Sequence, residues 1–162
     1  MIAINEQDIC IMTLQAQAGS DAAAFLIDMA SMYQQYAHRH SWITQTHLRH
    51  QTMQLEAIIS ITGQGIYPRL RFEQGAHRLQ RASVTDSQGR VKTSLVQVFV
   101  RPAPPAPLEE EIAGPIGDPK EKIRTYNVPQ DRATDHRCNL TIHPLADVLA
   151  GLLDPFFDAL NE

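Results

Sequence analysis

Apolar side chains recur at helical spacing over residues 21–38, and this stripe most constrains how the chain can fold. The stripe stands at positions i, i+4, i+7, i+8 and i+11, namely Phe25, Met29, Met32, Tyr33 and Tyr36. This spacing predicts an amphipathic helix. Ser20 is a suitable N-cap residue, and Asp21 favours the positive first turn. A helix with one apolar face must bury that face against a second layer.

Strand-like segments supply that layer. Short apolar or alternating runs predict strands at 8–14, 42–49, 53–62, 76–82, 92–101, 122–126 and 137–142. Residues 15–19 are expected to form a loop, residues 66–73 a short helix, and two more short helices are expected to start at Pro144 and at Asp154. The expected fold class is therefore α+β, an antiparallel or mixed sheet with one long helix packed on it and short C-terminal helices.

Proline divides the chain. Residues 102–119 hold six of the ten prolines and four acidic side chains without a basic one, a composition typical of a stiff, solvated connector. The chain has 162 residues, 43% of them hydrophobic, enough for one core. We expect residues 1–101 and 120–162 to share that core, with 102–119 as the linker between them.

Positive charge is concentrated in one stretch. The formal charge of the chain is -4, whereas residues 69–101 contain seven basic and two acidic side chains. A basic stretch in an acidic protein favours a local contact with a polyanion, although a solvated hairpin is the alternative. The longest apolar run, 22–27, is too short to span a bilayer, and no signal-peptide pattern opens the chain. The expectation is a cytoplasmic protein with no membrane partner.

Metal binding and nucleophilic catalysis are disfavoured. The histidines at 38, 40, 47 and 50 match no zinc spacing, so no metal site is expected. Ser83 and Ser87 have only distant histidines, which gives no nucleophile with its base. Cys10 and Cys138 lack a partnering motif and are expected to be buried thiols rather than a disulfide.

Four longer motifs occur in collinear order: AAAFLIDMASMYQQYAHRHSW at 22–42, ITGQGIYPRLRFEQGAHR at 61–78, QGAHRLQRASVTDSQGRVKTSLVQVFVRP at 74–102, and EKIRTYNVPQDRATDHRCNLTIHPL at 121–145. Together they resemble the codon-recognition superdomain of bacterial class I peptide chain release factors. Long collinear motifs are far more specific than one short pattern.

The family's hydrolytic Gly-Gly-Gln loop has no counterpart in this sequence. In the family, that loop lies on a domain inserted between the segments that resemble 74–102 and 121–145. This sequence contains no Gly-Gly pair, and only the proline-rich connector stands at that place. Gly63-Gln64-Gly65 corresponds to a structural turn instead. The resemblance thus implies a codon-recognition part at 1–101 completed by 120–162, without the catalytic domain or the family's N-terminal helical domain.

The resemblance also assigns candidate codon-binding residues. Ser83, Val84 and Thr85 occupy the tripeptide that reads the stop codon, Pro-x-Thr in one branch of the family and Ser-Pro-Phe in another, so the codon preference stays open. Gln80 and Thr93 match residues that contact the third base, and a glutamine amide can rotate to serve either purine. The alternative is that these residues belong to the ordinary surface of a hairpin and have no role in binding.

Two further codon contacts are altered relative to the family. Lys92 replaces a histidine that stacks between codon bases, and lysine offers charge but no stacking face. Gly19 and Asp21 lie at the helix tip, which in the family meets the first uridine; Asp21 could equally serve only the helix dipole.

Three arginines are candidates for contacts with ribosomal RNA. Arg124, Arg132 and Arg137 lie in the stretch that resembles the family's switch region. Exposed arginines beside acids are more often solvated ion pairs, and this alternative stays open.

The leading hypothesis is a non-enzymatic, cofactor-free protein that binds the 30S decoding centre and an mRNA stop codon without releasing the peptide, as a competitor or regulator of termination. A second hypothesis is a protein-interaction module that keeps the fold but no longer reads RNA. A third is one half of a split factor, whose protein partner supplies the catalytic domain.

Overall fold

A computed structural model describes residues 9–18, 20–82, 87–102 and 118–161. The strands are β1 Ile9–Gln17, β2 Ile43–His50, β3 Gln54–Thr62, β4 Gly75–Ala82, β5 Val91–Pro102, β6 Lys122–Asn127, β7 Arg132–Asp135 and β8 Leu140–Ile142. The helices are α1 Asp21–Arg39, α2 Ile66–Leu70, the 3-10 turn η1 Arg71–Glu73, α3 Leu145–Leu149 and α4 Asp154–Leu160. The expected α+β class is confirmed.

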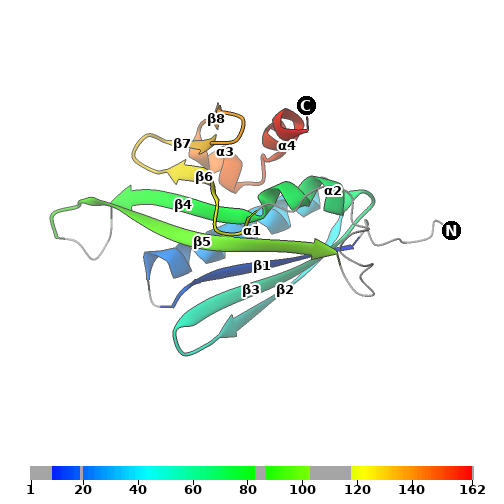
Figure 1. The fold of residues 1–162 in the computed structure, drawn as a ribbon, viewed down its shortest axis with the longest axis horizontal. Helices are drawn as coiled ribbons and strands as arrows, with labels where there is room; N and C mark the ends of the chain where they lie inside the picture. Colours follow the sequence, from blue (N-terminus) through cyan, green and yellow to red (C-terminus); the bar gives the residue numbers. More distant parts are fainter. Residues whose placement is uncertain (1–8, 19, 83–86, 103–117, 162) are drawn as a thin grey trace.

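The strands form one mixed, eight-stranded sheet in the order β2-β3-β1-β5-β4-β6-β7-β8. Helix α1, 19 residues long, lies across one face of this sheet (Figure 1). The five residues of the predicted stripe are all buried there, because α1 presents them to the sheet residues that point to its side. The hydrophobic core therefore lies between α1 and the sheet.

The start of α1 differs in detail from the prediction. Ser20 occupies the N-cap position but makes no side-chain cap; its hydroxyl instead donates to the carbonyl oxygen of Gln17 at 2.6 Å. The predicted loop at 15–19 is also wrong at its beginning. Residues 15–17 continue β1 because each pairs with β3, where Gln15 faces Glu56 and Gln17 faces Gln54.

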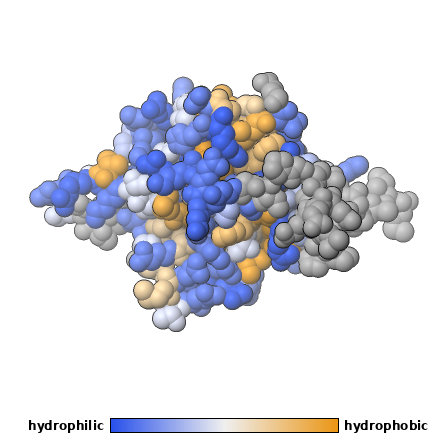
Figure 2. Space-filling view, in the orientation of Figure 1, coloured by the Kyte–Doolittle hydropathy of each residue, from blue (hydrophilic) through white to orange (hydrophobic). Residues whose placement is uncertain are grey.

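The predicted hairpins are confirmed. Strands β2 and β3 pair in antiparallel register from Ile43 opposite Thr62 to His50 opposite Leu55. Strands β4 and β5 pair likewise from Gly75 opposite Val98 to Ala82 opposite Val91. The far end of this second hairpin extends beyond the rest of the sheet (Figure 1), and its surface is mostly hydrophilic (Figure 2).

Strand β6 brings the C-terminal segment into the same sheet. It pairs in parallel with β4, from Ala76 opposite Lys122 to Gln80 opposite Asn127. The backbone N–H of Ala76 also donates to the carbonyl of Glu121 at 2.7 Å. Strand β5 ends at Pro102, and the described chain resumes at Asp118. The predicted linker lies almost wholly outside the described residues.

A buried ion-pair cluster joins this C-terminal segment to the rest of the core. The Arg124 guanidinium donates to both carboxylate oxygens of Glu73, at 2.6 and 2.7 Å, and to Oδ2 of Asp135 at 3.0 Å. All three residues are completely buried. Tyr33 of α1 donates its hydroxyl to Glu73 at 2.9 Å, and the Arg124 guanidinium lies 4.3 Å from the ring centre of Phe156 in α4.

Arg124 therefore cannot be an RNA contact in this structure, and that prediction is corrected. The sequence showed a basic residue in a basic, acid-flanked stretch, but its partners come from η1 and β7. An uncompensated buried charge is costly, so an arginine at this position must be paired. The cluster holds its charges in place: burial raises the pKa of Glu73, but Arg124 and neighbouring cations outweigh burial and keep that pKa below its ordinary value.

Three smaller sequence predictions, on the glycine turn, the cysteines and membrane spans, can be compared with the structure. Gly65 precedes α2 with a left-handed φ of 72°, and a Cβ on Gly63 would overlap the Trp42 ring at 2.0 Å. The Gly63–Gly65 segment is thus a structural turn. Cys10 is buried as expected, whereas Cys138 is only partly buried. Among the described helices none has the length and apolarity needed to cross a bilayer.

Candidate nucleic-acid interface

A groove of about 690 Å³ opens where β1 separates from β5. Strand β5 pairs with β1 only between Pro102 and Gln97, and beyond that point β5 continues alone with β4 into the projecting hairpin. Gln17, Ser20 and Asp21 line one wall of the groove, and Lys92 and Ser94 line the other. The fold thus brings the tip of α1 next to the arm of the hairpin.

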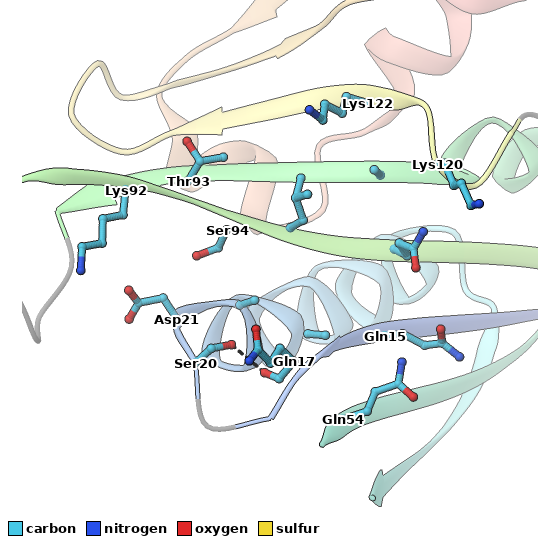
Figure 3. Close-up of a pocket in the computed structure, with 15 residues that line it drawn as sticks. Gln15, Gln17, Ser20, Asp21, Gln54, Lys92, Thr93, Ser94, Lys120 and Lys122 are labelled. Carbon is cyan, nitrogen blue, oxygen red and sulfur yellow. Dashed lines mark hydrogen bonds between the residues drawn. The ribbon is translucent and has the colours of Figure 1, made fainter. Parts of the chain in front are cut away.

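Asp21 and Lys92 face the same space from these two walls. Figure 3 shows Lys92 and Ser94 on the side of β5 that carries the start of α1, with Asp21 opposite them. Neither the Asp21 nor the Lys92 side chain has an ion pair or a hydrogen bond with another described residue. Two opposite charges, both available to a ligand, suit a partner that offers both hydrogen-bond donors and anionic groups.

Gln80 and Thr93 lie on the other face of the sheet. They are directly opposite each other in the β4–β5 ladder, and cross-strand partners share a face whereas successive residues alternate. Figure 3 shows the Thr93 side chain on the opposite side of β5 from Lys92. The side chains of the hairpin arm therefore leave it on two sides, Lys92 on the side of Asp21 and Gln80 with Thr93 on the other, and Thr93 also lines the edge of the groove.

A smaller cavity of about 260 Å³ adjoins Gln80 on this second face. Its lining combines hydroxyls, amides and cationic or titratable nitrogens without a carboxylate: Arg78, Gln80, Thr125, Asn127, Arg132, Thr134 and His136. Such a lining favours an electron-rich planar or anionic ligand group. The cavity is slightly smaller than ordinary drug-sized pockets.

Four predicted site residues, Gly19, Ser83, Val84 and Thr85, lie outside the described residues. Arg132 is exposed and lines the smaller cavity, so its RNA contact stays a prediction. Arg137 is largely engaged within the protein, with hydrogen bonds to Asp135 at 2.8 Å and to the Phe72 carbonyl at 2.6 Å.

Asn127 is a site residue that sequence reasoning missed. Its side-chain Nδ2 donates to Oε1 of Gln80 at 3.0 Å. The Asn-x-Pro-Gln pattern at 127–130 is a recognisable turn signal. Nothing local could have placed this turn beside Gln80, because the contact depends on the parallel pairing of β4 with β6.

Comparison with known proteins identifies the family. Residues 2–98 match the family described as the PCRF domain. The chain is 30% identical to peptide chain release factor 1 of Syntrophobacter fumaroxidans over 239 positions, which cover 97% of this chain and 67% of that protein. The chain belongs to the peptide chain release factor family. Peptide chain release factor 1 of Aquifex aeolicus is 31% identical, with 97% of this chain and 66% of the relative covered.

A solved structure shares the fold of the present chain. RF2 of Thermus thermophilus superposes with a TM-score of 0.78 over 97% of this chain and 68% of that chain, at 20% identity. The chain spans about two thirds of the length of its matched relatives. The alignment with the Syntrophobacter protein runs over 239 positions and this chain has 162 residues, so at least 77 aligned positions, the difference, have no counterpart here.

Proposed function

We propose that this chain is a release-factor-like protein that binds the ribosomal decoding site and a stop codon without hydrolysing peptidyl-tRNA, and so competes with or regulates termination. The observation that carries the proposal is the groove at which α1 and the hairpin meet, because it collects Asp21 and Lys92 from positions 71 residues apart. These positions match the helix tip and hairpin that read codons in the family.

The two polar surfaces of the hairpin support codon reading. A single strand can pass its bases on both sides of a narrow β-arm, and polar edges on each side can then hydrogen-bond different bases. In this proposal Asp21 and Lys92 contact the first two bases, and Gln80 and Thr93 contact the third. Lys120 and Lys122, at the far end of the groove, add positive charge suited to a phosphate backbone.

The absence of a Gly-Gly pair from the sequence supports binding without hydrolysis. At least 77 positions of a close relative have no counterpart in this chain, although the alignment covers 97% of it. The missing positions are therefore internal to the aligned region, as expected for a lost inserted domain. Because the ligand contacts of other domains are absent, we expect weaker binding than that of a complete factor.

Binding to 70S ribosomes with a stop or a sense codon in the A site, measured together with peptide release, tests this function. We expect stop-codon-dependent binding and no release. Release by the pure protein contradicts the proposal. Release that needs an added cell fraction supports a split factor, and no binding at tens of micromolar protein favours a protein-interaction module.

Restoring an aromatic ring at the stacking position should strengthen codon binding. Lys92→His is expected to tighten stop-codon complexes by about 5- to 150-fold, since a base stack contributes roughly 1–3 kcal/mol. Lys120→His, at the other end of the same groove, is the matched control for the altered charge. Equal effects of the two substitutions, measured as ribosome dissociation constants, contradict a base-stacking position at 92.

A further inference from the structure

The side-chain amide of Asn127 has a fixed orientation. The backbone N–H of Gln130 donates to one polar atom of this side chain at 3.0 Å. A backbone N–H only donates, so the atom it meets must be the acceptor, Oδ1. Nδ2 then points the other way, where it donates to Oε1 of Gln80 at 3.0 Å and to Oε1 of Gln130 at 3.3 Å.

The orientation of Gln80 follows from that of Asn127. Its atom facing the Nδ2 donor must accept and is therefore Oε1, so Nε2 is the atom left for a ligand. The main chain holds the two residues in place: Gln80 pairs with Asn127 in the β4–β6 ladder, and the backbone N–H of Val128 donates to the Gln80 carbonyl at 2.8 Å. Thr93, the cross-strand neighbour of Gln80, can donate or accept through its hydroxyl and imposes no such choice.

We propose that Asn127 is a positioning residue that fixes Gln80 as a hydrogen-bond donor, so that this face selects a ligand group that accepts. The inference rests on the proposed codon-binding function and concerns its third base. Guanine carries an acceptor, O6, where adenine carries a donor, the N6 amino group. A fixed Gln80 therefore favours a 6-oxo purine over a 6-amino purine, and the free amide rotation expected from the sequence does not occur.

Asn127→Asp is the decisive variant. One carboxylate oxygen can still accept the Gln130 N–H, which preserves the turn, but the other can only accept. Gln80 must then rotate its amide, donate Nε2 to the carboxylate, and turn Oε1 toward the ligand. We expect the wild-type chain to bind ribosomes with UAG in the A site about five- to tenfold more tightly than with UAA, and Asn127→Asp to reverse this ratio.

Two further variants separate this mechanism from a loss of structure. Gln80→Glu also presents an accepting oxygen and should shift the ratio toward UAA. Gln130→Ala leaves the backbone N–H of residue 130 and the Asn127–Gln80 hydrogen bond in place, so it should not change the ratio. Stop-codon-dependent binding with the same ratio in wild type and Asn127→Asp overturns the proposal.

Nuclear magnetic resonance on the free protein gives a test that does not depend on ribosomes. A scalar coupling across the hydrogen bond between Nδ2 of Asn127 and the side-chain carbonyl carbon of Gln80 is expected. Its absence, with a freely rotating Gln80 amide, overturns the positioning role of Asn127. Its presence without any codon-dependent ribosome binding supports that role while overturning the proposed function and, with it, the purine preference.

Discussion

Arg124→Met is expected to lower the free energy of unfolding by about 3–5 kcal/mol, the usual cost of leaving a buried charge without its partner. Arg124 is completely buried and donates to both Glu73 and Asp135. Asp135 keeps a second partner, since Arg137 donates to its Oδ2 at 2.8 Å. Within the described part of the chain, the Glu73 carboxylate then keeps a single hydrogen-bond donor, the hydroxyl of Tyr33. Most of the loss should therefore arise from Glu73, and urea denaturation measures it.

A second substitution identifies the source of that loss. Adding Glu73→Gln removes the stranded carboxylate, so the double variant should be more stable than the sum of the two single effects by at least about 1 kcal/mol. Arg132→Met is the matched control, because Arg132 is exposed on the neighbouring strand and its loss should change stability by less than about 0.5 kcal/mol. Additive effects in the double variant contradict a role of the buried Glu73 charge.

Lowering the pH from 6.5 to 4 should cost the protein about 3 kcal/mol of stability through His77 alone. Burial lowers the pKa of His77 to about 4 from the ordinary 6.5. Its ring is also occupied: Nε2 lies 2.8 Å from the Glu73 carbonyl, which can only accept, so Nδ1 must accept the Tyr126 hydroxyl at 3.0 Å. A second proton on this ring would displace the tyrosine hydrogen bond.

The direction of the pH effect on stability follows from the difference in proton binding between the two states. Between pH 6.5 and 4 the unfolded chain protonates His77 while the folded protein does not, so acid favours unfolding. Well above pH 6.5 His77 is neutral in both states, and this contribution to the pH dependence disappears. Glu73 and Asp135, whose pKa values lie below the ordinary range, add their own losses progressively below about pH 5, as the unfolded chain begins to protonate its carboxylates.

His77→Gln should remove this dependence, since glutamine does not titrate. The difference in unfolding free energy between wild type and variant, followed by denaturation from pH 7.5 to 4, should narrow or reverse by about 3 kcal/mol as the pH falls. Parallel curves over that range would show that His77 titrates normally. The other histidines are common to both proteins and cancel in the difference.

The local sequence pattern was sufficient to predict a helix or strand wherever a single hydrophobic periodicity dominated the segment. The stripe on α1 and the alternation in β3 produced the right elements, because each places its apolar residues on the single face that meets the core. Strand β7 escaped prediction, since its four residues carry no such pattern and become a strand only by pairing with β6 and β8.

In the candidate site, too, some features could be predicted from the sequence and others depend on contacts between distant segments. Asp21, Gln80, Lys92 and Thr93 were found through the resemblance to a family, whereas their separation onto two faces follows from strand alternation and sheet pairing. Arg124 and Asn127 could not be interpreted correctly from local sequence. Their decisive partners, Glu73 and Gln80, stand 51 and 47 residues away, and only the parallel β4–β6 contact brings them together.

Just before β6, the described chain is held to the start of β4, where the Ala76 N–H donates to the Glu121 carbonyl, and to β5, where the Gln97 side chain donates to the Pro119 carbonyl at 3.5 Å. These contacts fix the place at which the chain enters β6, whatever the length of the segment before it. The entropy of closing a loop grows only logarithmically, so a sixfold longer insertion costs about 1.5 kcal/mol. We therefore expect that a whole domain can be gained or lost between β5 and β6 during evolution while the pairing of β4 with β5 and β6 is kept.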